Sequence, residues 1–281
     1  MHAAARTGRL QRTFFIALLI VGILPGMVAL WATYHSSTAT LKQAIGEGFQ
    51  EIARSTAIRL ATAVDDEIDR TAHLASTLAA THTQETATAN TNSRRWQVPA
   101  PRNRQMAPGS ISPGWLDTWA RESRHYARVT VTDAQGLVIA STDPTLTARQ
   151  DDQTWWREAM QAKPGMAYVS TVVPDPRNSE AVFHIAVPLV GDPSGTTIGI
   201  VDVVVHRSLL THMILPIHIG NTGHAMLLDT QGTPLICPVL PPTAHLIPSG
   251  LMSRLATDHP LWLVADDDAH GPVNLCCVET P

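Results

Sequence analysis

The stretch VTVTDAQGLVIAST, residues 129–142, predicts a β-hairpin. Two strand-like runs flank the turn DAQG, which begins at Asp133 and places Gly136 at its late position. The same arrangement returns in AMLLDTQGTPLICP, residues 225–238, where DTQG replaces DAQG. Two copies of one strand-turn-strand unit predict two related modules in tandem, because self-similar units are the signature of repeated architectures.

The residues around the first copy predict an α+β fold. A helix is expected in WLDTWARESRHYA, which begins at Trp115, and further helices over 154–162 and 208–215. The sequences DPRNSE and GDPSG mark turns between strands. These segments together predict a small antiparallel sheet that carries helices. The remaining strand signals lie at residues 166–173, 181–189 and 196–205.

The N-terminal segment FFIALLIVGILPGMVALW, residues 14–31, contains no charged side chain. As a helix it would extend about 27 Å, close to the thickness of a bilayer's hydrocarbon core. Three arginines precede it and no acidic residue occurs before Glu47, so the positive-inside rule leaves the N-terminus in the cytoplasm. The alternative is a cleaved signal peptide, whose apolar region is usually shorter. We therefore expect an uncleaved signal anchor, with the chain exported from about residue 35.

Residues 38–80 contain no proline and carry apolar side chains at intervals of three and four, which predicts one long helix. Such a helix would extend about 60 Å, so we expect it to act as a spine whose apolar stripe is covered by later residues. A freestanding coiled coil is the alternative. Residues 83–113 are polar, contain four prolines and predict a loop. The stripe consists of Leu41, Ile45, Phe49, Ile52, Thr56, Leu60, Val64 and Ile68, with Leu74 and Leu78 in a shifted register.

Charge and motif content argue against several classes of function. The net charge is −4, so no basic surface for nucleic acid is expected. The sequence has neither a G-x-S-x-G nucleophile elbow nor a phosphate-binding loop, and we expect no catalysis and no cofactor. Consecutive side chains in DDDAH, residues 266–270, cannot all converge on one ion, so this segment predicts an acidic surface turn rather than a metal site.

The apolar segment and the long helix are followed, in this order, by VTVTDAQGLVIAST, WWREA, AYVSTVVPDP, VFHIAVPLV, TIGIVDVVV and IGNTGHAMLLDTQG. This order resembles the double Cache sensor domain, the extracytoplasmic ligand-binding part of many bacterial histidine kinases, chemoreceptors and cyclic-dinucleotide enzymes. The resemblance covers about residues 35–270. It implies a single-pass receptor of the bacterial inner membrane, with two PAS-like modules in the periplasm and a small-molecule ligand in the distal module. It also implies a histidine kinase as the output. A spine helix next to a membrane anchor favours a parallel homodimer formed through this helix.

The end of the chain departs from this pattern. No second apolar run of about 18 residues follows, and the tail GPVNLCCVETP has neither strand alternation nor a helical period. We therefore expect an incomplete second module and a truncated or frame-shifted receptor gene product. A stand-alone membrane-anchored binding or scaffold protein is the alternative. The expected division is a cytoplasmic N-terminus (1–12), a signal anchor (13–34), the spine helix (35–82), the distal module (83–215), a partial proximal module (216–270) and an irregular tail (271–281).

The resemblance also implies a set of site residues. Amino-acid sensors of the family hold the ligand carboxylate with Tyr and Arg ahead of a Trp-Tyr pair, and the ammonium group with a later Tyr, an Asp and a further Asp on the last strand. By position, Trp155 keeps the Trp, Trp156 replaces the Tyr, and Asp175 and Asp202 match the acidic positions. Three family positions depart: Ala148 stands in place of the first Tyr, Gln153 in place of Arg and Val173 in place of the later Tyr. With Ala148 and Gln153, the pair that holds the carboxylate is missing.

The acidic and aromatic half that remains favours a cationic ligand. Asp202 is a carboxylate inside an apolar strand, which is unfavourable unless something positive accompanies it. A cation over an indole face gains about 0.5–2 kcal/mol. We expect a small amine or other cation, with one of Trp155 and Trp156 packed into the sheet and the other forming a wall of the pocket. His184 alternates with apolar neighbours and is a further candidate to face the ligand.

Each of these residues also has a purely structural interpretation. The adjacent tryptophans could both be packing residues. Asp202 could pair with Arg128 or Arg149, and Asp175 could cap a turn before Pro176. His184 could be a sheet histidine whose hydrogen bonds are satisfied within the fold.

Overall fold

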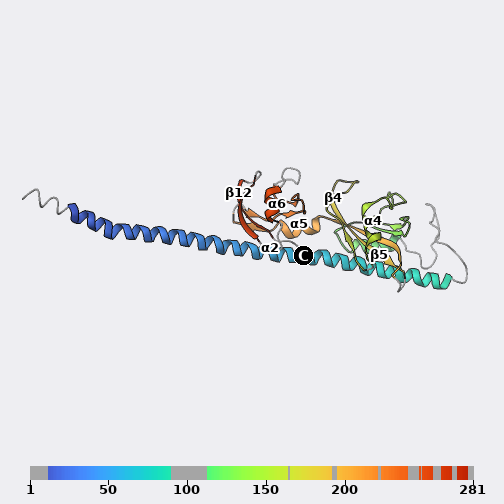
Figure 1. Cartoon of the computed structure of the whole chain (residues 1–281). Helices are drawn as coiled ribbons and strands as arrows, with labels where there is room; N and C mark the ends of the chain where they lie inside the picture. The colour runs from blue at the N-terminus through green and yellow to red at the C-terminus, as the bar shows by residue number, and fades with distance from the viewer. Residues whose placement is uncertain are drawn as a thin grey trace, which may run out of the picture. The chain divides into compact units, whose positions relative to one another are not determined.

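The computed structural model describes residues 12–89, 113–163, 165–191, 195–220, 223–239, 247, 249–255, 261–267 and 271–277. Figure 1 shows the whole chain coloured by residue number. The chain divides into two compact units, Met1–Ser55 with Thr257–Glu279 and Thr56–Ala256 with Thr280–Pro281. The larger unit contains the central sheet and the candidate site.

A single long helix begins the described chain. Residues 12–18 are helical, a π-helical turn (η1, Leu19–Ile23) follows, and α2 continues over Leu24–Ala89. Its most apolar window has a mean hydropathy of 2.5 and no buried residue, so by length and composition this helix could cross a membrane. The predicted anchor and spine are therefore parts of one continuous helix. Pro25 lies just after the π-helical turn, where the amide that proline lacks leaves one helical carbonyl without its donor.

The apolar stripe of α2 is buried only in its C-terminal half. Leu60, Leu74 and Leu78 are buried, and Val64 and Ile68 pack against the same core. By contrast, side chains of the N-terminal half of the stripe are 41–61% exposed, so the expected cover over the whole stripe is wrong for Leu41, Ile45 and Ile52.

The loop predicted from residue 83 begins later than expected. The helix continues to Ala89, because residues 83–89 contain Thr, Gln, Glu and Ala but neither proline nor glycine. Most of the predicted loop, residues 90–112, lies outside the described residues.

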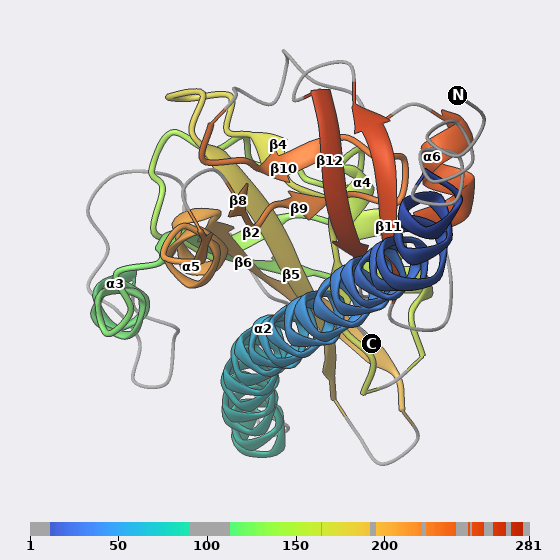
Figure 2. The same cartoon turned by 90° about the vertical axis from the view of Figure 1, so that its left-hand side faces the viewer.

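An antiparallel sheet forms the centre of the larger unit. Its strands are β1 (Tyr126–Asp133), β2 (Val138–Ser141), β3 (Tyr168–Val169), β4 (Val173–Pro174), β5 (Ala181–Val190) and β6 (Thr197–His206). They lie in the order β2-β1-β6-β5-β3, with β4 also paired to β5. Figure 2 labels β2, β4, β5 and β6 of this sheet. The accompanying helices are α3 (Pro113–Arg121), α4 (Thr154–Gln161) and α5 (Ser208–Ile214). The predicted α+β class, a mixture of helices and antiparallel sheet, is confirmed.

Two element boundaries differ from the prediction. The helix expected to reach Ala127 ends at Arg121, because β1 already begins at Tyr126, where it pairs with Val205 of β6. The strand expected over 166–173 is split into β3 and β4. Between these strands, the Ser170 hydroxyl accepts a hydrogen bond from the main-chain amide of His184 at 2.9 Å, replacing the next carbonyl of the ladder.

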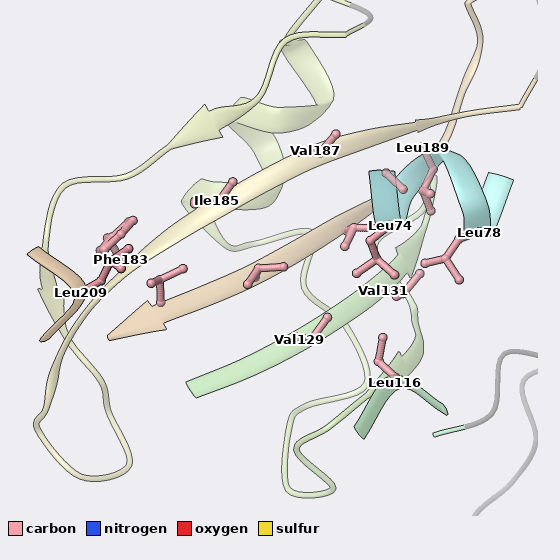
Figure 3. Close-up of a cluster of buried hydrophobic side chains, with 14 of the residues drawn as sticks. Leu74, Leu78, Leu116, Val129, Val131, Phe183, Ile185, Val187, Leu189 and Leu209 are labelled. Carbon is pink, nitrogen blue, oxygen red and sulfur yellow. The ribbon is translucent and has the colours of Figure 1, made fainter. Parts of the chain in front are cut away.

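Both faces of the sheet are buried. On one face, Val129, Val131 and their neighbours pack against Leu74 and Leu78 of α2, as Figure 3 shows. On the other face, Ala186 and Ile200 pack against Trp155 and Ala159 of α4. Because side chains alternate along a strand, every second residue of β6 faces α4. This alternation places Asp202 on the α4 face, with Ile200 and Val204 on either side of it along the strand.

The two predicted turns have the same hydrogen bonds. Asp133 Oδ1 accepts from the amides two and four residues later, at 2.9 and 2.8 Å, and Asp229 Oδ1 does so at 2.8 and 2.8 Å. Gly136 and Gly232 have φ of +76° and +82°, a conformation that favours glycine. A Cβ on Gly136 would lie 2.7 Å from Asp151, so the turn also requires glycine for space. The Asp-x-x-Gly turn therefore recurs in the structure, whereas the two related modules in tandem remain a prediction.

The strands after α5 are short until the end of the chain. They are β7 (His218–Ile219), β8 (Gly223–His224), β9 (Leu227–Leu228) and β10 (Pro234–Ile236), followed by α6 (Ser249–Leu255), β11 (Leu261–Asp267) and β12 (Gly271–Cys277). The irregular tail predicted from residue 271 is therefore wrong over β12. This strand pairs with β11 along its whole length, and main-chain pairing does not require the alternating pattern that the sequence lacks. Of the predicted acidic turn, residues 266 and 267 end β11 and residues 268–270 lie outside the described residues.

Candidate ligand-binding site

A buried carboxylate and an imidazole form the centre of the α4 face. Asp202 in the middle of β6 is 0% exposed, and His184 of β5 places Nδ1 3.0 and 3.1 Å from its two oxygens. The two residues are diagonal neighbours, since Asp202 pairs with Ala186 and His184 with Val204. Their contact therefore follows from the strand register rather than from sequence proximity.

Neither arginine considered as a partner of Asp202 pairs with it. Arg149 binds Asp151, with Nη2 2.8 Å from Oδ2, and both side chains are exposed. Arg128 lies 3.9 Å from Asp143. His184 was alternatively interpreted as a sheet histidine whose hydrogen bonds are satisfied within the fold. This interpretation is partly correct, because His184 itself is the partner of Asp202.

The two adjacent tryptophans begin α4 and both contact the sheet. Trp155 is 6% exposed and stacks on His184, with ring centroids 6.1 Å apart and planes 10° apart. Trp156 is half-buried, and its Nε1 donates to Thr132 Oγ1 at 3.0 Å. One indole stacks on His184, and the other is fixed to β1 through Thr132. The position of Trp156 is compatible with its expected role as a wall of the ligand pocket.

Gln153 is separated from this group. It immediately precedes α4, is exposed, and donates to Asp152 Oδ1 at 2.9 Å. Among the contacts of the described residues, none joins Gln153 to the side chains of Asp202, His184 or Trp155.

Asp175 belongs to a charged turn between β4 and β5. Its side chain is 2% exposed, and Arg177 donates to both of its oxygens at 2.6–3.2 Å. Hydrogen bonds from the Arg177 side chain lower the pKa of Asp175 to about 2 against the opposing effect of burial. Arg177 also donates to Asp143 at 3.1 Å, which ties this turn to the loop after β2. Asp175 therefore has the turn-forming role named as its alternative, and it makes no described contact with Asp202.

Several polar residues of this face were missed in the sequence. Thr130 and Thr132 are 0% exposed and lie on the α4 side of β1, and Thr130 is in register with Asp202. The alternation of Thr with Val in VTVT is the signal that could have identified them. Arg177, two residues after Asp175 in DPRNSE, could have been recognised as its partner. Among the described residues, no group of three or more His, Cys, Asp or Glu side chains is placed to hold a metal ion.

The fold is similar to solved ligand-binding domains. The domain of the Pseudomonas aeruginosa amino acid chemoreceptor PctC in complex with GABA is 18% identical, with 80% of this chain and 88% of that chain covered and a TM-score of 0.53. The domain of the Pseudomonas fluorescens chemoreceptor CtaA in complex with L-serine is 15% identical, with 81% and 87% covered and a TM-score of 0.52. At these identities the likeness establishes the fold alone. None of the curated proteins matches the chain.

The family is established by a match over most of the chain rather than to one motif. A family model described as a Cache domain matches residues 37–258, which begin on α2 and include the sheet, α4 and the second Asp-x-x-Gly turn. The predicted resemblance is therefore confirmed, and this chain belongs to the double Cache family of sensor domains.

Proposed function

We propose that this chain senses a small molecule outside the cytoplasm as the ligand-binding part of a membrane-anchored receptor. The ligand is a small amine or other cation, and it binds on the α4 face of the sheet. The observation that carries the proposal is the buried Asp202 carboxylate, whose described partner is a titratable imidazole rather than a guanidinium or ammonium group. A cationic ligand would supply a full positive charge to this buried carboxylate.

The surroundings of Asp202 are suited to a cation. Trp155 and Trp156 supply two indole rings at the start of α4, and a desolvated cation gains from such a ring. Gln153 lies apart and exposed, so no guanidinium is available at that position to hold a carboxylate. The solved neighbours PctC and CtaA are in complex with GABA and L-serine, both of which carry an amino group. We infer that Asp202, one acidic residue of the amino-binding half of such a site, is retained.

The same sheet provides a route from this face to α2. Val201 and Val203 flank Asp202 in β6 and belong to the core that contains Leu74 of α2. The Tyr126 hydroxyl of β1 also donates to the Glu67 carboxylate of α2. Since α2 is continuous with the apolar helix that could enter a membrane, a shift of the sheet on ligand binding would act on the anchor. The single-pass inner-membrane placement, the homodimer along α2 and a histidine kinase output remain parts of the proposal.

Binding of amines to the full chain in lipid nanodiscs tests this function. Calorimetric titration would compare ethanolamine and putrescine with α-amino acids and with succinate, for the wild type and for Asp202→Asn. This variant keeps the shape of the side chain and an acceptor for His184. Asp152→Asn, which neutralises an exposed carboxylate next to α4, is the matched control.

We expect saturable binding of an amine that is retained in Asp152→Asn and lost in Asp202→Asn. Binding of succinate but of no amine would refute the cationic ligand. An amine response that survives Asp202→Asn unchanged would move the site away from the α4 face.

A further inference from the structure

A cavity of the larger unit lies outside the α4 face. It has a volume of about 370 Å³, comparable with the smaller pockets that hold small molecules, ~300–1,000 Å³. Its walls come from the end of α3, the start of β1 and the residue after β2. None of the residues assigned to the candidate ligand site lines it. The side chains that matter most are Asp117, Arg121, Arg124, Tyr126 and Arg128.

Positive charge predominates in this cavity. Arg121, Arg124 and Arg128 face a single acidic residue, Asp117. Within the described part of the chain, no carboxylate lies within ion-pair distance of Arg121 or Arg124. Both of these arginines are exposed and able to turn toward an occupant.

Arg128 is the residue that lacks a full complement of partners. Its side chain is 11% exposed, and its nearest carboxylate oxygen, Asp143 Oδ2, is 3.9 Å away. That oxygen already accepts from Arg177 at 3.1 Å, and Asp143 Oδ1 accepts from Thr145. Among the described residues, Nε of Arg128 is the buried side-chain nitrogen without a hydrogen-bond partner. A buried donor of this kind is rare in folded proteins and points to a missing acceptor.

We propose that this cavity binds a small oxyanion, a carboxylate or phosphate group. Guanidinium groups match both geometrically, because their parallel N–H donors meet two oxygens at once. The anion would bind the guanidinium group of Arg128, which lines the cavity, and draw in Arg121 and Arg124. The anion would also contact Tyr126, whose hydroxyl donates to Glu67 of α2. Occupancy of the cavity would therefore affect the contact between the sheet and α2.

The site can be tested apart from the amine site with the full chain in nanodiscs. Inorganic phosphate and succinate would be titrated separately at constant ionic strength with chloride as the balancing anion, and the unfolding temperature would be followed by tryptophan fluorescence. The variants are Arg128→Gln and the double variant Arg121→Gln/Arg124→Gln, which replaces two exposed side chains. Arg54→Gln, an exposed arginine of α2, is the control for loss of one positive charge.

We expect saturable stabilisation by at least one of the two anions. Its apparent Kd would rise at least tenfold in Arg128→Gln and in the double variant and stay unchanged in Arg54→Gln. Saturation by phosphate alone or by succinate alone would identify the group that the cavity takes. An unsaturable response, or equal affinity in all variants, would overturn the proposal. Asp202→Asn should leave anion binding intact, so failure of the amine site and failure of this site give different results.

Discussion

The charged turn that holds Asp175 should make a measurable contribution to stability, and Arg177→Gln tests it. Lowering the pKa of Asp175 from 3.8 to about 2 corresponds to about 2 kcal/mol, since a tenfold change in proton affinity is about 1.4 kcal/mol. Arg177 is 36% exposed, so solvent screening reduces the contribution to about 1–2 kcal/mol. We expect Arg177→Gln to lower the free energy of unfolding at pH 7 by this amount.

The pH dependence has a fixed sign. Because the pKa of Asp175 is lower in the folded chain, the stabilisation is fully present above about pH 4 and is lost as the pH falls through about 2. The difference in unfolding free energy between the wild type and Asp175→Asn should shrink over this range. In Arg177→Gln, further replacement of Asp175 by Asn should produce a much smaller pH-dependent change.

Urea unfolding of the full chain in dodecyl maltoside micelles, followed by tryptophan fluorescence, would measure these quantities. Arg149→Gln is the matched control, because its ion pair with Asp151 also joins residues two apart but is exposed. We expect that control to change stability less than the experimental error. If Arg177→Gln were no more destabilising than Arg149→Gln, or if the pH dependence were the same with and without Asp175, the reasoning would be wrong.

Two further predictions concern the attachment of the sheet to α2. Leu74→Ala should lower the free energy of unfolding by about 2–5 kcal/mol, because this side chain is 1% exposed. Leu41 lies in the same helix but is 61% exposed, so Leu41→Ala should be nearly neutral. Urea unfolding would compare the two variants. Tyr126→Phe should lower the free energy of unfolding by about 1–3 kcal/mol, because the buried Glu67 carboxylate loses the hydrogen bond from the Tyr126 hydroxyl. Burial also raises the pKa of Tyr126, so ultraviolet titration of the wild type should show a phenol that ionises only well above pH 10. Equal effects of the two leucine variants, or ionisation of every tyrosine near pH 10, would contradict these expectations.

The features predicted correctly are those that local sequence determines. An Asp-x-x-Gly turn forms from its own four residues, because the aspartate accepts from nearby amides and glycine accepts a positive φ. The hairpin of β1 and β2, the helix α4 and the long strands β5 and β6 follow from alternation and periodicity over short windows. The continuous helix through Ala89 was missed because polar composition was taken as a loop signal where helix propensity was adequate.

The chemistry of the candidate site depends on contacts that no local pattern contains. His184 was identified as a candidate and so was Asp202, yet the sequence offered Arg128 and Arg149 as partners of the carboxylate. The choice is made by the register of β5 against β6, which places His184 diagonally across from Asp202. Arg128 instead lies 3.9 Å from Asp143, which is also distant in sequence from β6. Strand β12 was missed for the same reason, since its pairing with β11 is a property of two segments together.

The position of Asp202 within β6 explains how one strand can serve both binding and signalling. Its carboxylate faces α4, while Val201 and Val203 on either side face the core that contains Leu74 of α2. The alternation of a strand requires these side chains to move together, because a rotation or shift of the backbone at Asp202 displaces its two neighbours as well. The packed core on the α2 side has few voids to absorb such a displacement. In the proposed receptor, a ligand that attracts Asp202 would therefore act on α2 through the adjacent valines, without a moving loop or a second hinge.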